Sequence, residues 1–159
     1  MKRIVSTVLV AGVMASVAFV TPVAIARPEV QSTTCNLDGS VTINPGLTFS
    51  VQAEKIKLTA TLSACNGGGV TGGSASGKGK GNLSCTSGTA NATIHITWNT
   101  TETSTLKMSV NVGNGSVSGT VSSGKFAGET VSGSLTVHPT SGNCITPVKT
   151  ANVSGSVSL

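Results

Sequence analysis

The chain has 159 residues and a formal net charge of +5, and only 9% of its residues are charged. Ser and Thr together exceed a quarter of the chain, glycine occurs 20 times, and tyrosine is absent. Aromatic side chains are few, and the basic side chains are not clustered in the sequence. A typical nucleic-acid-binding surface needs both, so this class of function is excluded. The scattered lysines suit only weak attraction to an anionic surface.

The N-terminus has the pattern of a secretory signal peptide. A short basic start precedes an almost wholly apolar run at residues 4–20, and residues 24–26 (Ala-Ile-Ala) match a signal-peptidase site. We expect residues 1–26 to be removed and residues 27–159 to form one secreted domain with a net charge of about +3. An uncleaved anchor is the alternative, because the apolar stretch is just long enough to span a bilayer.

Most of the secreted part alternates apolar and polar residues with a period of two. This is the pattern of antiparallel strands with one dry face and one wet face. Gly, Asn, Pro and Ser turns separate the segments, and no convincing helix follows residue 26. We predict an all-β domain, a single antiparallel β-sandwich that could be immunoglobulin-like, with a partly closed barrel as the alternative. About nine strands are expected, at residues 41–43, 47–51, 56–63, 73–83, 93–99, 106–112, 117–121, 131–137 and 153–159.

The glycine-rich segment at residues 67–83 is open to two interpretations. Its small residues alternate with polar ones, so that Lys78 and Lys80 would share one face of a flat strand. A mobile loop is the alternative. An edge strand whose lysines prevent further pairing would reconcile the two interpretations.

A short pattern, Val-Ser-Gly followed by Ser or Thr and an aliphatic residue, occurs at residues 117–121, 131–135 and 153–157. In each copy the glycine falls in the apolar row of the expected strand. Such a glycine leaves room for a large side chain or for a second backbone to approach closely, although chance repetition is the alternative in a chain of this composition. The aromatic candidates to fill these gaps are Phe49, Trp98 and Phe126.

Four cysteines lie in the exported part, where disulfides persist. Two disulfides are expected among Cys35, Cys65, Cys85 and Cys144, and of the three possible pairings we favour Cys35 with Cys85 and Cys65 with Cys144. No C-x-x-C pair and no suitably spaced histidines support a zinc site, so we predict neither a metal nor a cofactor.

Several motifs together resemble a group of small secreted actinobacterial proteins without an assigned activity. They are CNLDGSVTINPGL at residues 35–47, LTATLSAC at 58–65, ITWNT at 96–100, GKFAG at 124–128 and GNCITPVKTANVSGSV at 142–157. This resemblance covers essentially the whole secreted part. It implies export and the all-β fold, and it implies no mechanism.

Catalytic motifs are incomplete. GGSASGK at residues 72–78 resembles a phosphate-binding loop but lacks the Ser or Thr that follows the lysine and the helix that follows the loop. Two S-x-x-K matches, at residues 104–107 and 122–125, lie in expected strand or turn, whereas that motif needs a helix. Asp38, His95 and His138 could contribute to a Ser-His-Asp arrangement, but Asp38 lies in an expected turn and His95 on a polar face.

We therefore predict a non-enzymatic binding or structural module that acts at or outside the bacterial cell envelope. Its partner would be an unidentified envelope or extracellular component, with no nucleic acid and no stable membrane insertion after signal cleavage. The expected contact surfaces are residues 67–82 and the Thr-rich turn at residues 99–104, since function on β-domains tends to lie in loops. The alternatives are an envelope hydrolase that uses His95 or His138 and, with less support, an exported pore.

Overall fold

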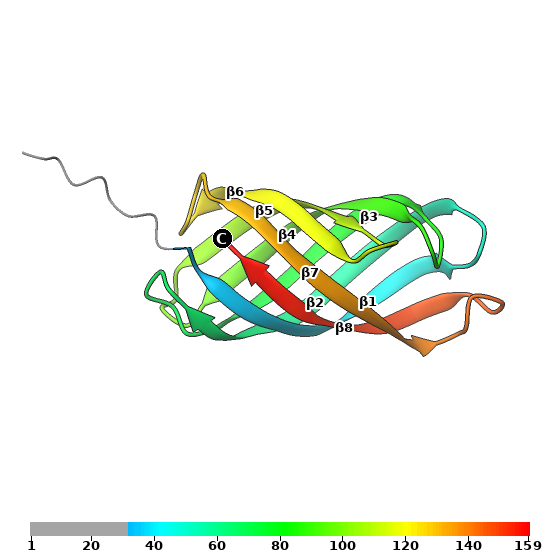
Figure 1. Ribbon diagram of the computed structural model, residues 1–159, viewed down its shortest axis with the longest axis horizontal. Coiled ribbons are helices and arrows are strands. Elements are labelled where there is room, and N and C mark those ends of the chain that lie inside the picture. The colour runs from blue at the N-terminus through cyan, green and yellow to red at the C-terminus, as the bar shows by residue number, and fades with distance from the viewer. Residues whose placement is uncertain (1–31) are drawn as a thin grey trace, which may run out of the picture.

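The structure is a computed structural model that describes residues 32–159. The predicted signal peptide lies outside this range. The described residues contain no helix long and apolar enough to cross a membrane. They form eight antiparallel strands in one sheet (Figure 1). The strands are β1 (Thr34–Leu47), β2 (Gln52–Asn66), β3 (Gly73–Leu83), β4 (Gly88–Trp98), β5 (Thr103–Asn111), β6 (Ser116–Gly124), β7 (Thr130–Ser141) and β8 (Val148–Ser158).

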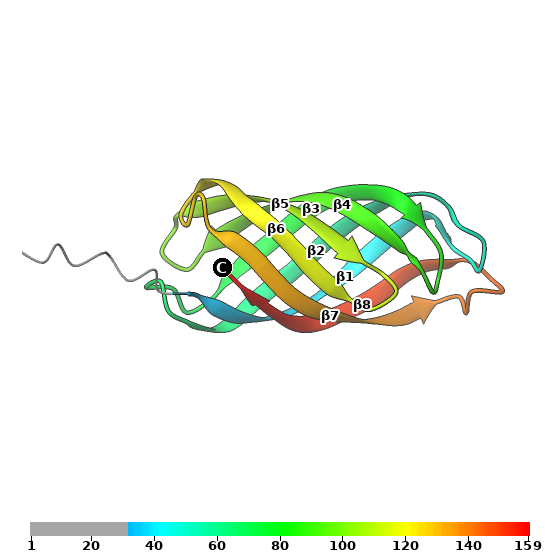
Figure 2. The ribbon, with the colours of Figure 1, turned by 45° about the horizontal axis from the view of Figure 1, so that its top comes forward.

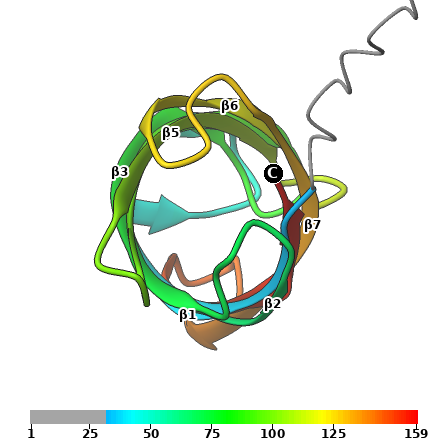
Figure 3. The same cartoon turned by 90° about the vertical axis from the view of Figure 1, so that its left-hand side faces the viewer.

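The sheet closes on itself as a barrel. Each strand pairs with the next, and β1 also pairs antiparallel with β8 from Thr34↔Ser158 to Leu47↔Val148. The view along the barrel shows the resulting ring (Figure 3). The all-β, antiparallel prediction is confirmed, but the β-sandwich is wrong. Sandwiches and barrels share the same alternating pattern, and only the pairing of the first strand with the last separates them.

The structure has eight strands where about nine were predicted, because residues 47–51 do not form a strand. Leu47 ends β1, and the following residues make the turn into β2, where the Ser50 backbone N–H donates a hydrogen bond to the Thr48 hydroxyl (3.2 Å). Phe49 lies in this turn with 64% of its surface exposed, so the prediction that it fills a gap in the core is also wrong.

The alternation predicted for the other strands is confirmed and has a simple geometric meaning. Inward positions carry mainly Val, Leu, Ile, Ala and Gly, whereas the outward positions of β3, β4 and β5 are all Ser, Thr, Asn, Lys or His. Because successive side chains of a strand point to opposite faces, this period of two separates a dry interior from a wet outer surface around the barrel.

The repeated Val-Ser-Gly segments lie on the adjacent strands β6, β7 and β8. Their glycines face inward, as predicted, and each pairs with a larger residue on the next strand: Gly119 with Val131, Gly133 with Val117, and Gly155 with Leu135. A Cβ atom at Gly155 would collide with the carbonyl oxygen of Ser134. A second backbone therefore occupies the space beside this glycine, and small and large residues alternate inside the barrel.

The segment at residues 73–83 is a strand, and its predicted position at a sheet edge is wrong. β3 pairs along its whole length with β2 and with β4. Only the residues before it form a loop, in which Gly67, Gly68 and Gly69 have positive φ angles. Lys78 and Lys80 therefore do not protect an edge but lie in the middle of a continuous sheet.

Different sets of loops lie at the two ends of the barrel (Figure 2). At the plugged end, where β2 turns into β3 and β4 into β5, Trp98 is buried and meets the half-buried Phe126 edge to face, with ring centroids 5.4 Å apart. The Trp98 indole N–H donates a hydrogen bond to the Ser104 hydroxyl (2.8 Å), which donates to the Lys125 carbonyl. Phe126 lies against Gly68. Trp98 is thus a core residue, as predicted, and this end is filled.

The opposite end, which we call the open end, is formed by the loops at residues 48–51, 84–87, 112–115 and 142–147. Near it, the buried Glu54 carboxylate accepts hydrogen bonds from the Gly46 N–H (3.0 Å) and the Gln52 side-chain amide (2.9 Å). A buried carboxylate with both oxygens satisfied in this way holds the β1–β2 turn in place.

Both predicted disulfides are present, but the favoured pairing is wrong. Cys35 bonds to Cys65, with Cα atoms 4.1 Å apart, and Cys85 bonds to Cys144, with Cα atoms 6.1 Å apart. Cys35 and Cys65 lie at the plugged end, whereas Cys85 and Cys144 lie in loops of the open end. The predicted pairs would have had to connect opposite ends of the barrel. Two disulfides are compatible with an oxidising, extracellular location.

Tryptic peptide mapping without reduction tests the pairing directly. Lysines separate the four cysteines into different tryptic peptides, namely residues 27–55, 58–78, 81–107 and 126–149. We expect mass spectrometry to find the first peptide linked to the second and the third linked to the fourth. A link between residues 27–55 and 81–107 would contradict the structure.

Gly155→Ala should destabilise the barrel by about 1–3 kcal/mol, because the added methyl group meets the backbone of β7 and overpacked cores lose stability on this scale. Chemical denaturation measures the loss. Gly79→Ala is the matched control, since its nearest new neighbours would be 3.0 Å away, and it should cost less. Equal losses would contradict the close approach of the β7 backbone as the reason for glycine at position 155.

Candidate functional site

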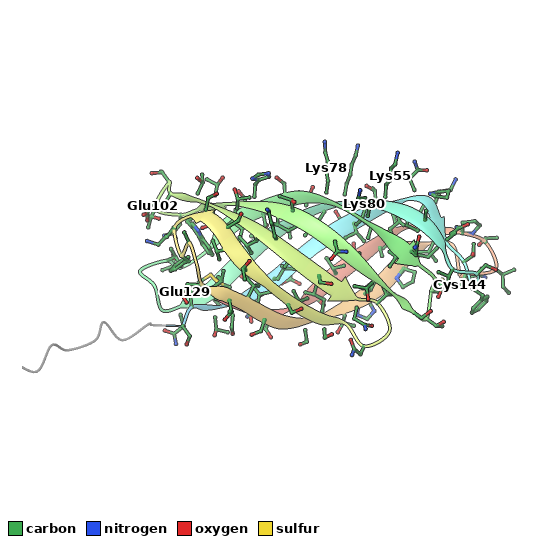
Figure 4. All side chains as sticks on the ribbon, turned by 90° about the horizontal axis from the view of Figure 1, so that it is seen from above. Lys55, Lys78, Lys80, Glu102, Glu129 and Cys144 are labelled. Carbon is green, nitrogen blue, oxygen red and sulfur yellow. A yellow bond between two sulfur atoms is a disulfide. The ribbon has the colours of Figure 1, made fainter. Side chains whose placement is uncertain are left out.

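Five of the seven lysines in the described residues project from the outer surface of β2, β3 and β5, and all five are exposed. Figure 4 shows Lys55, Lys78 and Lys80 pointing away from the same side of the barrel. We call this surface the lysine face and define it by Lys55, Lys57, Lys78, Lys80 and Lys107.

Cross-strand register places four of these lysines in directly opposed pairs. Lys55 lies opposite Lys80, and Lys57 lies opposite Lys78. Residues paired in this way have Cβ atoms about 5 Å apart, and like charges at this separation destabilise a sheet. The arrangement therefore concentrates positive charge at the expense of some stability.

A shallow, open hollow between exposed side chains crosses the lysine face from β2 to β6. One side is formed by Lys55, Lys80, Asn91, Ser109 and Ser118, and the other by Lys57, Lys78, Thr93 and Lys107. Between these two rows of outward side chains lie residues that face inward, among them Ile56, Gly79, Ala92 and Met108. They form the floor of the hollow. At about 4.8 Å per strand, the four spacings from β2 to β6 make an arc of about 19 Å around the barrel wall, which is half of its circumference.

A second hollow, of about 440 Å³, lies beside the first. Lys57, Lys78 and Thr93 border both hollows, and His95 borders the second. Ammonium, hydroxyl and amide groups thus alternate over this part of the surface. These groups can bind several anionic oxygens at once through charge-assisted and neutral hydrogen bonds.

The carboxylates of the described residues do not neutralise the lysine face. Glu54 is buried inside the barrel, Asp38 projects from β1, and Glu102 and Glu129 lie in loops of the plugged end, away from the labelled lysines in Figure 4. In residues 32–159 the one ion pair joins Lys125 to Glu102, at 2.7 Å. The electrostatic potential of the lysine face is therefore not balanced by neighbouring side chains.

Lys125, unlike the lysines of the lysine face, is paired with a carboxylate, that of Glu102. The Lys125 ammonium donates a hydrogen bond to Glu102 and, with a second bond from the Thr100 hydroxyl, lowers the pKa of this exposed carboxyl. Lys125 also lies 5.3 Å from the Phe126 ring centroid. This lysine belongs to the structure of the plugged end.

Of the two predicted contact surfaces, one contributes to the lysine face. Residues 67–82 supply Lys78 and Lys80, from a strand and not from a loop. The turn at residues 99–104 has a structural role instead: the Asn99 side chain accepts hydrogen bonds from the backbone N–H groups of Thr71 (3.0 Å) and Gly72 (3.4 Å). It links two loops of the plugged end.

The candidate catalytic residues do not come together. Asp38 lies on β1, His95 on β4 and His138 on β7, all exposed, and none of these strands is adjacent to another in the sheet. His95 shares a hydrogen bond of 3.2 Å with the Thr105 hydroxyl. Within residues 32–159 no group of three or more His, Cys, Asp or Glu side chains could hold a metal ion.

Sequence reasoning missed Lys55, Lys57 and Lys107 as site residues. The signal was present, because the period of two placed Lys57 and Lys107 on the polar faces of their strands. The pairing register that brings β2, β3 and β5 to one side of the barrel was not visible in the sequence. Comparisons of the chain with protein families, with curated proteins and with solved structures find no match.

Lys78→Gln should raise the stability of the barrel at low salt by about 0.2–1 kcal/mol, because it removes the like charge opposite Lys57. The gain should shrink as added salt screens the repulsion. Urea denaturation at two salt concentrations measures both effects. Lys125→Gln is the control and should give no gain, because it removes an ion pair; a gain of the same size there would contradict repulsion on the lysine face.

Proposed function

We propose that this chain is an exported, non-enzymatic binding module that attaches through the lysine face to an anionic polymer at or outside the bacterial cell envelope. The observation that carries the proposal is the cross-strand register that places Lys55 opposite Lys80 and Lys57 opposite Lys78, without a neighbouring carboxylate. Mutually repelling charges on one face reduce the stability of the folded chain. An anionic partner that binds there is attracted by these charges and relieves their repulsion.

The shape of the face favours a polymer over a membrane. The outward side chains of β3, β4 and β5 are polar throughout, so the face offers no apolar group to insert between lipids. The hollows cross several strands, and a flexible chain with repeated phosphate or carboxylate groups could follow them.

Export is part of the proposal and is supported by the signal-peptide pattern of residues 1–26 and by the two disulfides. The resemblance to small secreted actinobacterial proteins points the same way. The hydrolase alternative is less well supported, because Asp38, His95 and His138 lie on separate strands of the outer surface. The pore alternative is also weaker, because here the polar residues face outward and the apolar ones inward.

The test is binding of purified residues 27–159, with disulfides intact, to isolated cell-envelope material and to two soluble probes, long-chain polyphosphate and polygalacturonate. We expect saturable binding to the envelope material and to at least one probe. It should weaken between low salt and about 0.15 M salt, where the Debye length is about 8 Å. The double variant Lys57→Gln/Lys78→Gln should bind at least about fivefold more weakly, a loss of about 1 kcal/mol.

The matched control is Lys125→Gln/Lys149→Gln, which removes the same charge from outside the lysine face. It should bind like the unaltered protein. Equal losses of affinity in the two double variants would show that binding depends on net charge and not on the lysine face, and would contradict the proposal. Binding to vesicles of anionic lipid but to neither polymer probe would replace the polymer with a membrane surface as the partner.

A further inference from the structure

The interior of the barrel is not completely filled. A cavity of about 130 Å³ lies inside it, bordered almost wholly by aliphatic side chains. It adjoins both apolar clusters of the core, one that includes Leu62, Ile94 and Leu106 and one at the open end that includes Ile43 and Leu83.

The unfilled space follows from the sequence of β3. Its inward positions between Ala75 and Leu83 are Gly77, Gly79 and Gly81, so this strand contributes no side chain to the middle of the barrel. The row through Gly79 continues on β4 with another small residue, Ala92. An eight-stranded barrel is just wide enough for side chains to fill it, or for one small ligand. Because three consecutive inward positions of β3 are glycine, this barrel has room for one small ligand.

One of the apolar residues that border the cavity is exposed, and it lies on β7. The pairing of β6 with β7 runs only from Ser116↔Ser134 to Thr120↔Thr130, so the second half of β7 has no partner on that side. Val137 belongs to the inward row of β7 and borders the cavity, yet 42% of its surface is exposed. Val110 and Val112, both half-buried, border the cavity as well. We call this unpaired side of β7, beside Val137, the β7 notch.

Apolar side chains gather at the same end of the molecule. The large hydrophobic residues exposed in residues 32–159 are Phe49, Val51, Val137 and Ile145, and all four lie on β7 or in loops of the open end. Scattered exposed apolar residues are ordinary, but a concentration at the mouth of an apolar cavity is typical of a ligand entrance. The plugged end, with its aromatic pair and its hydrogen bonds, offers no such route.

We infer that the barrel binds one short aliphatic molecule, which enters through the β7 notch and leaves its polar end group in water. The cavity contains no polar partner that would require a polar ligand. An apolar cavity of about 150 Å³ in another protein stays dry and binds benzene, so the present one accommodates about six carbon atoms. That capacity selects a small free molecule over the acyl tail of a membrane lipid.

The probe for the test is n-hexanol, titrated into residues 27–159 and followed by methyl NMR. Saturable shifts are expected at Val110, Leu135 and Val137 and not at the exposed Ile145. Ala92→Leu should weaken this binding at least tenfold, because the larger side chain occupies the cavity. The control Ala53→Leu adds the same atoms at an outward, exposed position of β2 and should leave binding unchanged.

A series from n-propanol to n-decanol keeps the inference open to contradiction even if Ala92→Leu does not fold. The affinity should rise up to about six carbon atoms and then level off as the cavity fills. An affinity that rises through the whole series, or no saturable shift at the three methyl-bearing residues, would overturn the inference. The double variant Lys57→Gln/Lys107→Gln changes two residues of the lysine face that do not border the cavity and should bind n-hexanol normally, so a failure here and a failure of the lysine face are separate results.

Discussion

The ladder between β1 and β8 is the constraint on which the rest of the structure depends. The first and last strands pair over most of their length, so the sheet has a defined circumference and a separate inside and outside. An open sheet of the same sequence would leave the edges of both strands unpaired, which favours association with other chains. Closure also explains why outward positions are polar all around the molecule, because water surrounds the ring on every side.

The closed barrel encloses an interior that the inward side chains fill unevenly. On β6, β7 and β8 the inward glycines face larger partners on a neighbouring strand. On β3 the inward glycines also face larger partners on β2, Gly77 opposite Leu58 and Gly79 opposite Ile56, but a cavity bordered by both glycines remains. The plugged end is stabilised by Trp98 and its hydrogen bond to Ser104, whereas the open end lacks an equivalent aromatic plug. The interior is therefore asymmetric along the barrel axis.

The outer surface is asymmetric around the axis. The consecutive pairing of β2, β3, β4 and β5 brings lysines from three of these strands together on one charged surface. Pairing within the ladder fixes two of their contacts as like-charge pairs, which no strand propensity favours. Residues that weaken the fold locally without an evident structural gain are those in which function is expected. The same argument does not apply to Lys125, whose charge is balanced by Glu102.

The sequence by itself determined the strand class, most strand positions, the direction in which Trp98 and the repeated glycines face, and the presence of two disulfides. These properties follow from a local period of two and from composition. Only the tertiary structure decided between sandwich and barrel, paired Cys35 with Cys65, and joined five lysines into one face. Each of these depends on which strands are neighbours and in what register. Register is a long-range property, and the alternating pattern is compatible with many registers that differ by two residues.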